Sequence, residues 1–179
     1  MKIGVFCSAN ENIAAEFFDC ARQLGSWIAA NAHSLVYGGT RLGLMGAVAN
    51  AVHDGGGTVI GILPMELSRR GIAADCNDVV VPCDNLSDRK ELMMAQADVF
   101  VALPGGIGTL DEAFTVAAAA TAGYHTKKVI LLNTGGFWNK LTELLDSLQQ
   151  SGFIRDSWHN HFIVCDSAES AEKEISKLQ

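Results

Sequence analysis

Short apolar runs alternate with longer amphipathic segments along the chain, and this alternation limits the possible folds more than any other feature. The run KIGVF (residues 2–6) is typical of a strand, and residues 11–31 after it carry apolar residues at helical spacing. Several runs are apolar throughout, as expected of strands that are covered on both faces. Strands and helices in alternation predict an α/β fold, with a doubly wound parallel sheet and helices on both of its faces.

The alternation continues to the end of the sequence without an internal repeat, a linker or a low-complexity segment, so we expect one domain over residues 1–179. The expected strands are residues 2–6, 34–39, 58–63, 98–103, 128–133 and 161–165. The expected helices are residues 11–31, 44–53, 86–97, 110–122 and 137–150, followed by a final helix. Residues 64–81 are less regular and contain the short apolar run VVV.

Composition narrows the classes of function. Of the 179 residues, 49% are hydrophobic and 18% are charged, which is typical of a globular chain with a large core. The net charge of −7 argues against a protein that binds nucleic acid or a membrane surface, because such proteins need a basic face. Five scattered cysteines without C-x-x-C spacing favour reduced, mostly buried thiols. No segment resembles a signal peptide or reaches transmembrane length, so we expect a cytoplasmic protein.

Two glycine-rich turns follow predicted strands and lead directly into predicted helices. The first is YGGTRLGLMG (residues 37–46), in which Gly39 and Gly43 are candidate substrate contacts, and the second is LPGGIGT (residues 103–109). Ligands of doubly wound sheets bind beyond the carboxyl ends of the strands, and the free amides of a helix start attract anions. Two such turns side by side predict a site for a phosphorylated ligand. The segment CSANEN (residues 7–12) after the first strand lacks glycine, which argues against the dinucleotide fingerprint of dehydrogenases.

Charged residues lie on both sides of the second turn. Asp111 and Glu112 follow it, and Arg89 and Lys90 begin a helix at the same edge of the predicted sheet. Both groups have an ordinary explanation. Thr109 to Glu112 reads T-x-x-E, a capping box in which the glutamate only satisfies a backbone amide, and a basic pair is usually a solvated face. In the functional interpretation, the basic pair instead meets a phosphate or orients a carboxylate.

Three motifs, in order, resemble those of one known family. YGGTRLGLMG resembles G-G-x-x-G-L-M-G, RKELM resembles R-K-x-x-M, and PGGIGTLDE matches P-G-G-x-G-T-x-x-E. Together they resemble the LONELY GUY (LOG) family of cytokinin riboside 5′-monophosphate phosphoribohydrolases, and the resemblance covers most of the chain. Many bacterial members are labelled "possible lysine decarboxylase". That label fits the sequence poorly, because nothing marks a lysine that would hold pyridoxal phosphate.

The resemblance implies a Rossmann-like fold, commonly a homodimer, that hydrolyses the N-glycosidic bond of AMP or N6-substituted AMP without a cofactor or metal. It implies that Arg89 and Glu112 are the catalytic pair. It also implies a set of substrate-binding residues around the second turn: Lys90, Gly105, Gly106, Gly108, Thr109 and Asp111. Breaking this bond builds positive charge on the ribose, which the Glu112 carboxylate would stabilise while it activates water. The sequence leaves open whether Arg89 orients Glu112 or contacts the nucleotide.

Departures from the family pattern leave the base preference open. Leu86 and Ser87 stand where many relatives have methionine and histidine, and residues 119–121 (AAT) stand where plant-type members have W-A-Q. Two other functions therefore remain in view. One is an AMP nucleosidase with little base preference. The other is a non-catalytic carrier of a nucleotide or of the molybdenum cofactor, because such carriers resemble the family in fold and in the P-G-G-x-G-T turn; the presence of Arg89 with Glu112 favours the enzyme.

Overall fold

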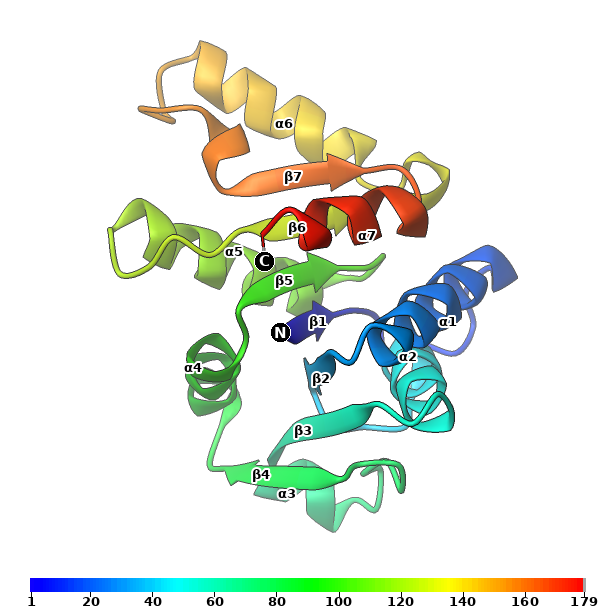
Figure 1. Cartoon of the computed structure of the whole chain (residues 1–179). Helices are drawn as coiled ribbons and strands as arrows, with labels where there is room; N and C mark the ends of the chain where they lie inside the picture. Colours follow the sequence, from blue (N-terminus) through cyan, green and yellow to red (C-terminus); the bar gives the residue numbers. More distant parts are fainter. Residues whose placement is uncertain (179) are drawn as a thin grey trace.

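The computed structural model describes residues 1–178. Within these residues seven parallel strands form one sheet in the order β4-β3-β2-β1-β5-β6-β7 (Figure 1). The strands are β1 (Lys2–Phe6), β2 (Ser34–Tyr37), β3 (Thr58–Pro64), β4 (Val79–Cys83), β5 (Val99–Ala102), β6 (Val129–Leu132) and β7 (Phe162–Cys165). The helices are α1 (Ala15–Ala30), α2 (Gly43–Asp54), α3 (Met65–Arg69), α4 (Leu86–Gln96), α5 (Ile107–Thr121), α6 (Asn139–Gln150) and α7 (Ala168–Ser176), with short 3₁₀ turns at Thr134–Gly136 and Trp158–Asn160. The predicted doubly wound α/β fold is confirmed.

The strands are apolar throughout because helices cover both faces of the sheet. Helices α1 and α2 lie on one side, whereas α4 and α5 lie on the other (Figure 1). Along β5, Val99 and Val101 belong to the core under α1, α2 and α7, while Phe100 and Ala102 belong to the core under α4, α5 and α6. Successive side chains of a strand point to opposite faces, so a strand buried on both sides needs an unbroken apolar run.

The strand order places a switch point between β1 and β5. From β1 the chain builds outward through β2 and β3 to β4, and then α4 returns it to β5 on the opposite side of β1. The connections that leave β1 and β5 therefore diverge to opposite faces of the sheet beyond the carboxyl ends of these two strands. Switch points of this kind are where doubly wound proteins bind their ligands.

Three segments differ from the sequence prediction. Helix α1 begins at Ala15 rather than at residue 11, because Ala14 before it is in an extended conformation. Residues 64–81, expected to be irregular, contain helix α3 and most of strand β4, which is an edge strand with its Val79 and Val80 side chains about half exposed. An edge strand tolerates Pro82, which cannot donate to a neighbouring strand. Helix α5 begins at Ile107, three residues before the predicted start at Leu110. This earlier start changes the interpretation of the acids that follow it.

All five cysteines are buried and unpaired, as the sequence predicted. Within residues 1–178, no helix combines the length and the apolar character that crossing a membrane requires.

Candidate functional site

The loop after β1 connects the two glycine-rich turns at the switch point. The backbone amide of Ser8 donates to the carbonyl of Pro104 at 3.2 Å, and the carbonyl of Ser8 accepts from the amide of Leu44 at 2.9 Å. The prediction that the two turns lie directly side by side is therefore wrong, because β1 and the loop after it run between them. Sequence reasoning missed Ser8, because a loop that acts through its backbone leaves no signature in side-chain type.

The first turn, residues 37–46, is filled by the protein itself. Gly43 has a φ of +54°, and a Cβ on it would lie 2.5 Å from the backbone carbonyl carbon of Ala9. Gly39 has a φ of +75°, and its carbonyl accepts hydrogen bonds from the backbone amide of Ala74 and from the side-chain amide of Asn77, each at 3.0 Å. Backbone conformation and packing within the chain thus explain both glycines. Substrate contact by Gly39 and Gly43 stays a prediction.

The second turn, residues 103–109, is open. Gly106 is the N-cap residue of α5 and carries no side-chain cap, and neither Gly106 nor Gly108 has a positive φ. Among residues 1–178, a Cβ on either glycine would meet no atom within 4 Å. Gly105 differs, because a Cβ there would overlap the buried side chain of Thr109. Neither strain nor internal packing calls for glycine at 106 and 108, so we infer that the bare backbone leaves space for a ligand at the amides of the helix start.

The predicted capping box is wrong. The carbonyl of Gly106 accepts the amide of Leu110 at 3.0 Å, so α5 is already helical before Thr109 could cap it. Thr109 lies inside the first turn, and this turn contains no acidic residue. Glu112 consequently lies one turn further along, in a part of the helix where amides already have intrahelical partners. Capping does not explain the presence of Glu112.

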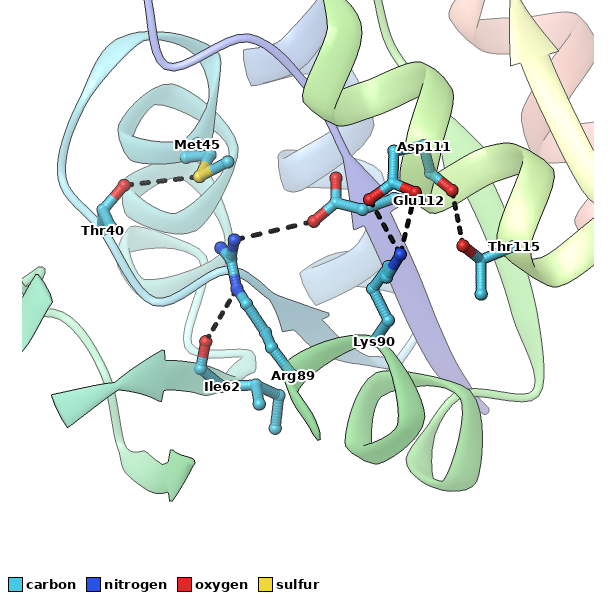
Figure 2. A network of polar contacts seen from close by, with 8 residues as sticks. All are labelled: Thr40, Met45, Ile62, Arg89, Lys90, Asp111, Glu112 and Thr115. Carbon is cyan, nitrogen blue, oxygen red and sulfur yellow. Dashed lines mark hydrogen bonds and ion pairs between the residues drawn. The ribbon is translucent and has the colours of Figure 1, made fainter. Parts of the chain in front are cut away.

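Arg89 of α4 and Glu112 of α5 meet in the interior of the protein. Asn85 caps α4 by accepting hydrogen bonds from the amides of Ser87 and Asp88, which fixes the helix start just before Arg89. The Arg89 Nη1 lies 3.6 Å from the Glu112 Oε1, and both side chains are less than a tenth exposed (Figure 2). Arg89 Nε donates to the carbonyl of Ile62 at 3.2 Å. The basic pair is therefore not a solvated face.

The electrostatic state of Glu112 is unusual. Burial raises its pKa to about 7, even though the Arg89 guanidinium favours the charged form; Asp111 raises the pKa further and Lys90 lowers it. Between pH 4.5 and about 7 the unfolded chain has released this proton while the folded protein keeps it, so stability falls as pH rises through this range. At neutral pH both forms of the carboxyl are populated. Such a group can accept or donate a proton during a reaction.

Lys90 and Asp111 form a second pair beside the first. The Lys90 Nζ donates to both carboxylate oxygens of Asp111 at 2.8 Å, and the Asp111 side chain is 55% exposed (Figure 2). The same two helices thus contribute a buried pair and an exposed pair from consecutive residues. The buried Cys7 thiol also interacts electrostatically with this buried pair, and burial raises its pKa far above the ordinary value, which argues against a role as a nucleophile. Within residues 1–178, no cluster of three or more His, Cys, Asp or Glu side chains is arranged to hold a metal.

The open helix start and the buried carboxylate–guanidinium pair place this chain in the class of doubly wound α/β proteins with polar groups gathered at the switch point, where proteins of this architecture commonly bind their ligands. A sequence model described as "Possible lysine decarboxylase" matches residues 45–175, and the chain belongs to this family. The resemblance to the LOG family is thereby confirmed, since curated relatives carry that name.

Two curated relatives and one solved structure illustrate the similarity. "Probable cytokinin riboside 5′-monophosphate phosphoribohydrolase LOGL2" of Oryza sativa subsp. japonica is 40% identical over 99% of this chain and 72% of its own length. "Cytokinin riboside 5′-monophosphate phosphoribohydrolase LOG5" of Arabidopsis thaliana is 37% identical over 99% of this chain and 77% of its own length. The Moco carrier protein of Chlamydomonas reinhardtii shares 26% identity, with a TM-score of 0.75 over 99% of this chain and 96% of that protein.

Proposed function

We propose that this protein hydrolyses the N-glycosidic bond of adenosine 5′-monophosphates, including N6-substituted ones, to the free base and ribose 5-phosphate. The observation that carries the proposal is the buried Glu112 carboxyl, held by Arg89 one helical turn beyond an open helix start. The names of relatives about 40% identical over nearly the whole chain support the same activity.

The open turn supplies the binding step. The amides at the start of α5, around Gly106 and Gly108, receive the 5′-phosphate, because unpaired amides and the helix dipole favour an anion. The phosphate then fixes the ribose near Glu112, and holding the reacting groups together contributes to the rate. The exposed pair of Lys90 and Asp111 lies beside the buried pair. There the Asp111 carboxylate can accept hydrogen bonds from ribose hydroxyls, while Lys90 offers positive charge to the nucleotide.

Glu112 supplies the chemical step. As the bond between C1′ and the base nitrogen breaks, its electron pair leaves with the base, and the positive charge that builds on the ribose is stabilised by the ionised carboxylate. The oxygen of a water molecule bonds to C1′, and Glu112 takes the proton that the water releases. With a pKa of about 7, the carboxyl can return this proton to the departing base.

Arg89 acts in this scheme by orienting Glu112. The Nη1 faces the carboxylate and the Nε is engaged by Ile62. The remaining nitrogen, Nη2, is closed to solvent and lacks a hydrogen-bond partner among residues 1–178. A nucleotide at the switch point has no path to this nitrogen unless the side chain moves, which favours orientation over direct contact.

The proposal extends to the setting of the enzyme, a cytoplasmic homodimer that does not bind nucleic acid or membranes. The net charge of −7 and the five buried free thiols suit a reducing compartment and a small-molecule substrate. Apolar side chains exposed on α4 and α5 support a second copy as the partner. They are Leu86, Ile107 and Phe114.

Glu112→Gln tests the function. Incubated with AMP and with N6-substituted AMP, the wild type should release free base, and the variant should be slower by about 100-fold or more, since the key charge is lost. Nucleotide binding should persist, because the open turn is unchanged. In the wild type, kcat/KM should fall as the pH drops below about 7, where the carboxylate becomes protonated. Free base is measured by chromatography.

Glu143→Gln is the matched control, because Glu143 is exposed on α6 and pairs only with Lys140 in the described structure. It should leave the rate unchanged. A Glu112→Gln variant as active as the wild type would refute the proposed chemistry. A wild type that binds nucleotide without releasing base would instead support a carrier, the function that the similarity to the Moco carrier protein favours.

A further inference from the structure

Gly38 has no part in the binding and chemical steps proposed above. It follows β2 directly, and its φ is not positive, so its backbone conformation is open to any residue. A Cβ on Gly38 would overlap the Nη2 of Arg89 and lie 2.6 Å from its Cζ, with the Met45 sulfur next at 3.1 Å. The space that a side chain would need at position 38 is occupied by the Arg89 guanidinium.

The guanidinium cannot simply move aside to make room. Its Nε is bonded to the carbonyl of Ile62 on β3, and its Nη1 faces Glu112 on α5 (Figure 2). The third nitrogen rests against Gly38 and has no hydrogen-bond partner among residues 1–178. The guanidinium therefore has a neighbour at each of its three nitrogens. A shift large enough to make room for a Cβ at position 38 would break the hydrogen bond to Ile62 or the ion pair with Glu112.

We propose that Gly38 is a positioning residue for the hydrolytic reaction, whose missing side chain gives the Arg89 guanidinium the place from which it faces Glu112. The inference rests on the proposed function. A side chain at position 38 displaces the guanidinium and leaves the carboxyl without its nearest positive charge. The other ionisable groups that face Glu112 remain: Lys90 on α4, Asp111 on α5 and the neutral thiol of Cys7 after β1.

Gly38→Ala is the direct test. With AMP as substrate, kcat should fall by about 100-fold, while KM changes little because the open turn is intact. The acidic limb of kcat/KM should move to higher pH, because Arg89 favours the charged form of Glu112 and its displacement removes that effect. A purely structural role for Gly38 would lower the amount of folded protein without moving this limb.

Gly55→Ala is the matched control. Gly55 ends α2 with a φ of −80°, and a Cβ on it would lie 2.7 Å from the Cβ of Ala29, so the substitution also crowds a tight contact. This contact lies between α1 and α2, away from the buried pair. The variant should lose stability, but it should keep the wild-type kcat and the wild-type pH limb.

A stability cycle tests the same contact without any assay of activity. Gly38→Ala should lower the urea midpoint of unfolding in the wild type but not in an Arg89→Ala background, where the guanidinium that the new methyl group would meet is gone. Equal shifts in the two backgrounds would overturn the proposal, as would a Gly38→Ala enzyme with wild-type kcat and pH limb. If either of these two contrary outcomes is found while Glu112→Gln is inactive, only the role of Gly38 is refuted and the proposed function stands.

Discussion

The two glycine-rich turns look alike in sequence and differ in structure. In the turn after β2, Gly38 lies against Arg89 and Gly43 lies against the backbone of the loop after β1, so the protein occupies the space that the glycines leave. In the turn after β5, Gly106 and Gly108 have open space where a side chain would be. The first turn therefore packs against the buried pair, and the second turn is the better candidate for the ligand-binding site.

The contrast between the two turns separates glycines that the fold requires from glycines that a ligand would require. A glycine with a positive φ or a close neighbour is explained by the fold, as Gly43 is. A glycine with neither, such as Gly108 within the first turn of α5, has no such cause among residues 1–178, which supports the proposal that a ligand approaches the backbone there. Substitutions in each turn test this distinction.

The largest effect is expected from Gly43→Ala. The new side chain would have to adopt a φ of +54° and would lie 2.5 Å from the backbone of Ala9. Both penalties fall on the folded state, so we expect a loss of about 3 kcal/mol or more in the free energy of unfolding, measured with urea. Gly106→Ala is the control in the open turn and should lose no more than about 1 kcal/mol, the usual cost of alanine at an N-cap position. Similar losses for the two variants would remove the distinction between the turns.

A smaller effect, on binding rather than on folding, is expected from Gly108→Ala. Alanine favours a helix over glycine by about 1 kcal/mol, so the protein should be at least as stable as the wild type. Its methyl group projects into the space assigned to the phosphate, and the affinity for AMP should fall by about 10-fold or more. Calorimetric titration in the Glu112→Gln background measures this. Adenosine, which lacks the phosphate, is the control ligand, and an equal loss for both ligands would contradict a phosphate seat in this turn.

The smallest effect is expected at the exposed pair beside the open turn. Lys90→Gln should move the acidic limb of kcat/KM to higher pH, and Asp111→Asn should move it to lower pH, because the two charges act on Glu112 with opposite signs. Solvent screens the pair, so each shift should stay below about one pH unit and shrink in high salt. Shifts in the same direction would show that these residues do not act on Glu112 through their charge.

Much of the fold was predictable because apolar periodicity reports burial directly. The unbroken run at β5 requires cover on both faces, and the structure provides it with Val101 facing one core and Phe100 facing the other. Edge strand β4 was harder to predict. Val79 and Val80 are consecutive apolar residues that are both about half exposed, so the segment lacks the alternation of polar and apolar residues that marks a half-buried strand. Strand and helix ends were predicted to within a few residues, apart from α1, which begins at Ala15 rather than at residue 11.

The site was predictable only in part. The resemblance pointed to Arg89 and Glu112, but the residue types alone suggested a solvated basic pair and a capping glutamate. Burial decides between these interpretations, and burial depends on where α4 and α5 start and how they pack. The contact of Gly38 with Arg89 joins residues about 50 positions apart, so no local pattern in the sequence could reveal it.

The way in which Arg89 is held affects which positions of the sequence can change during evolution. A main-chain carbonyl and an absent side chain keep the guanidinium in place, and substitutions at the exposed starts of α4 and α5 alter neither. Leu86 and Ile107, the first residues of α4 and α5, project into solvent with 60% and 87% of their surface exposed. The apolar surface proposed to meet a second copy can therefore change in sequence while the buried pair keeps its geometry.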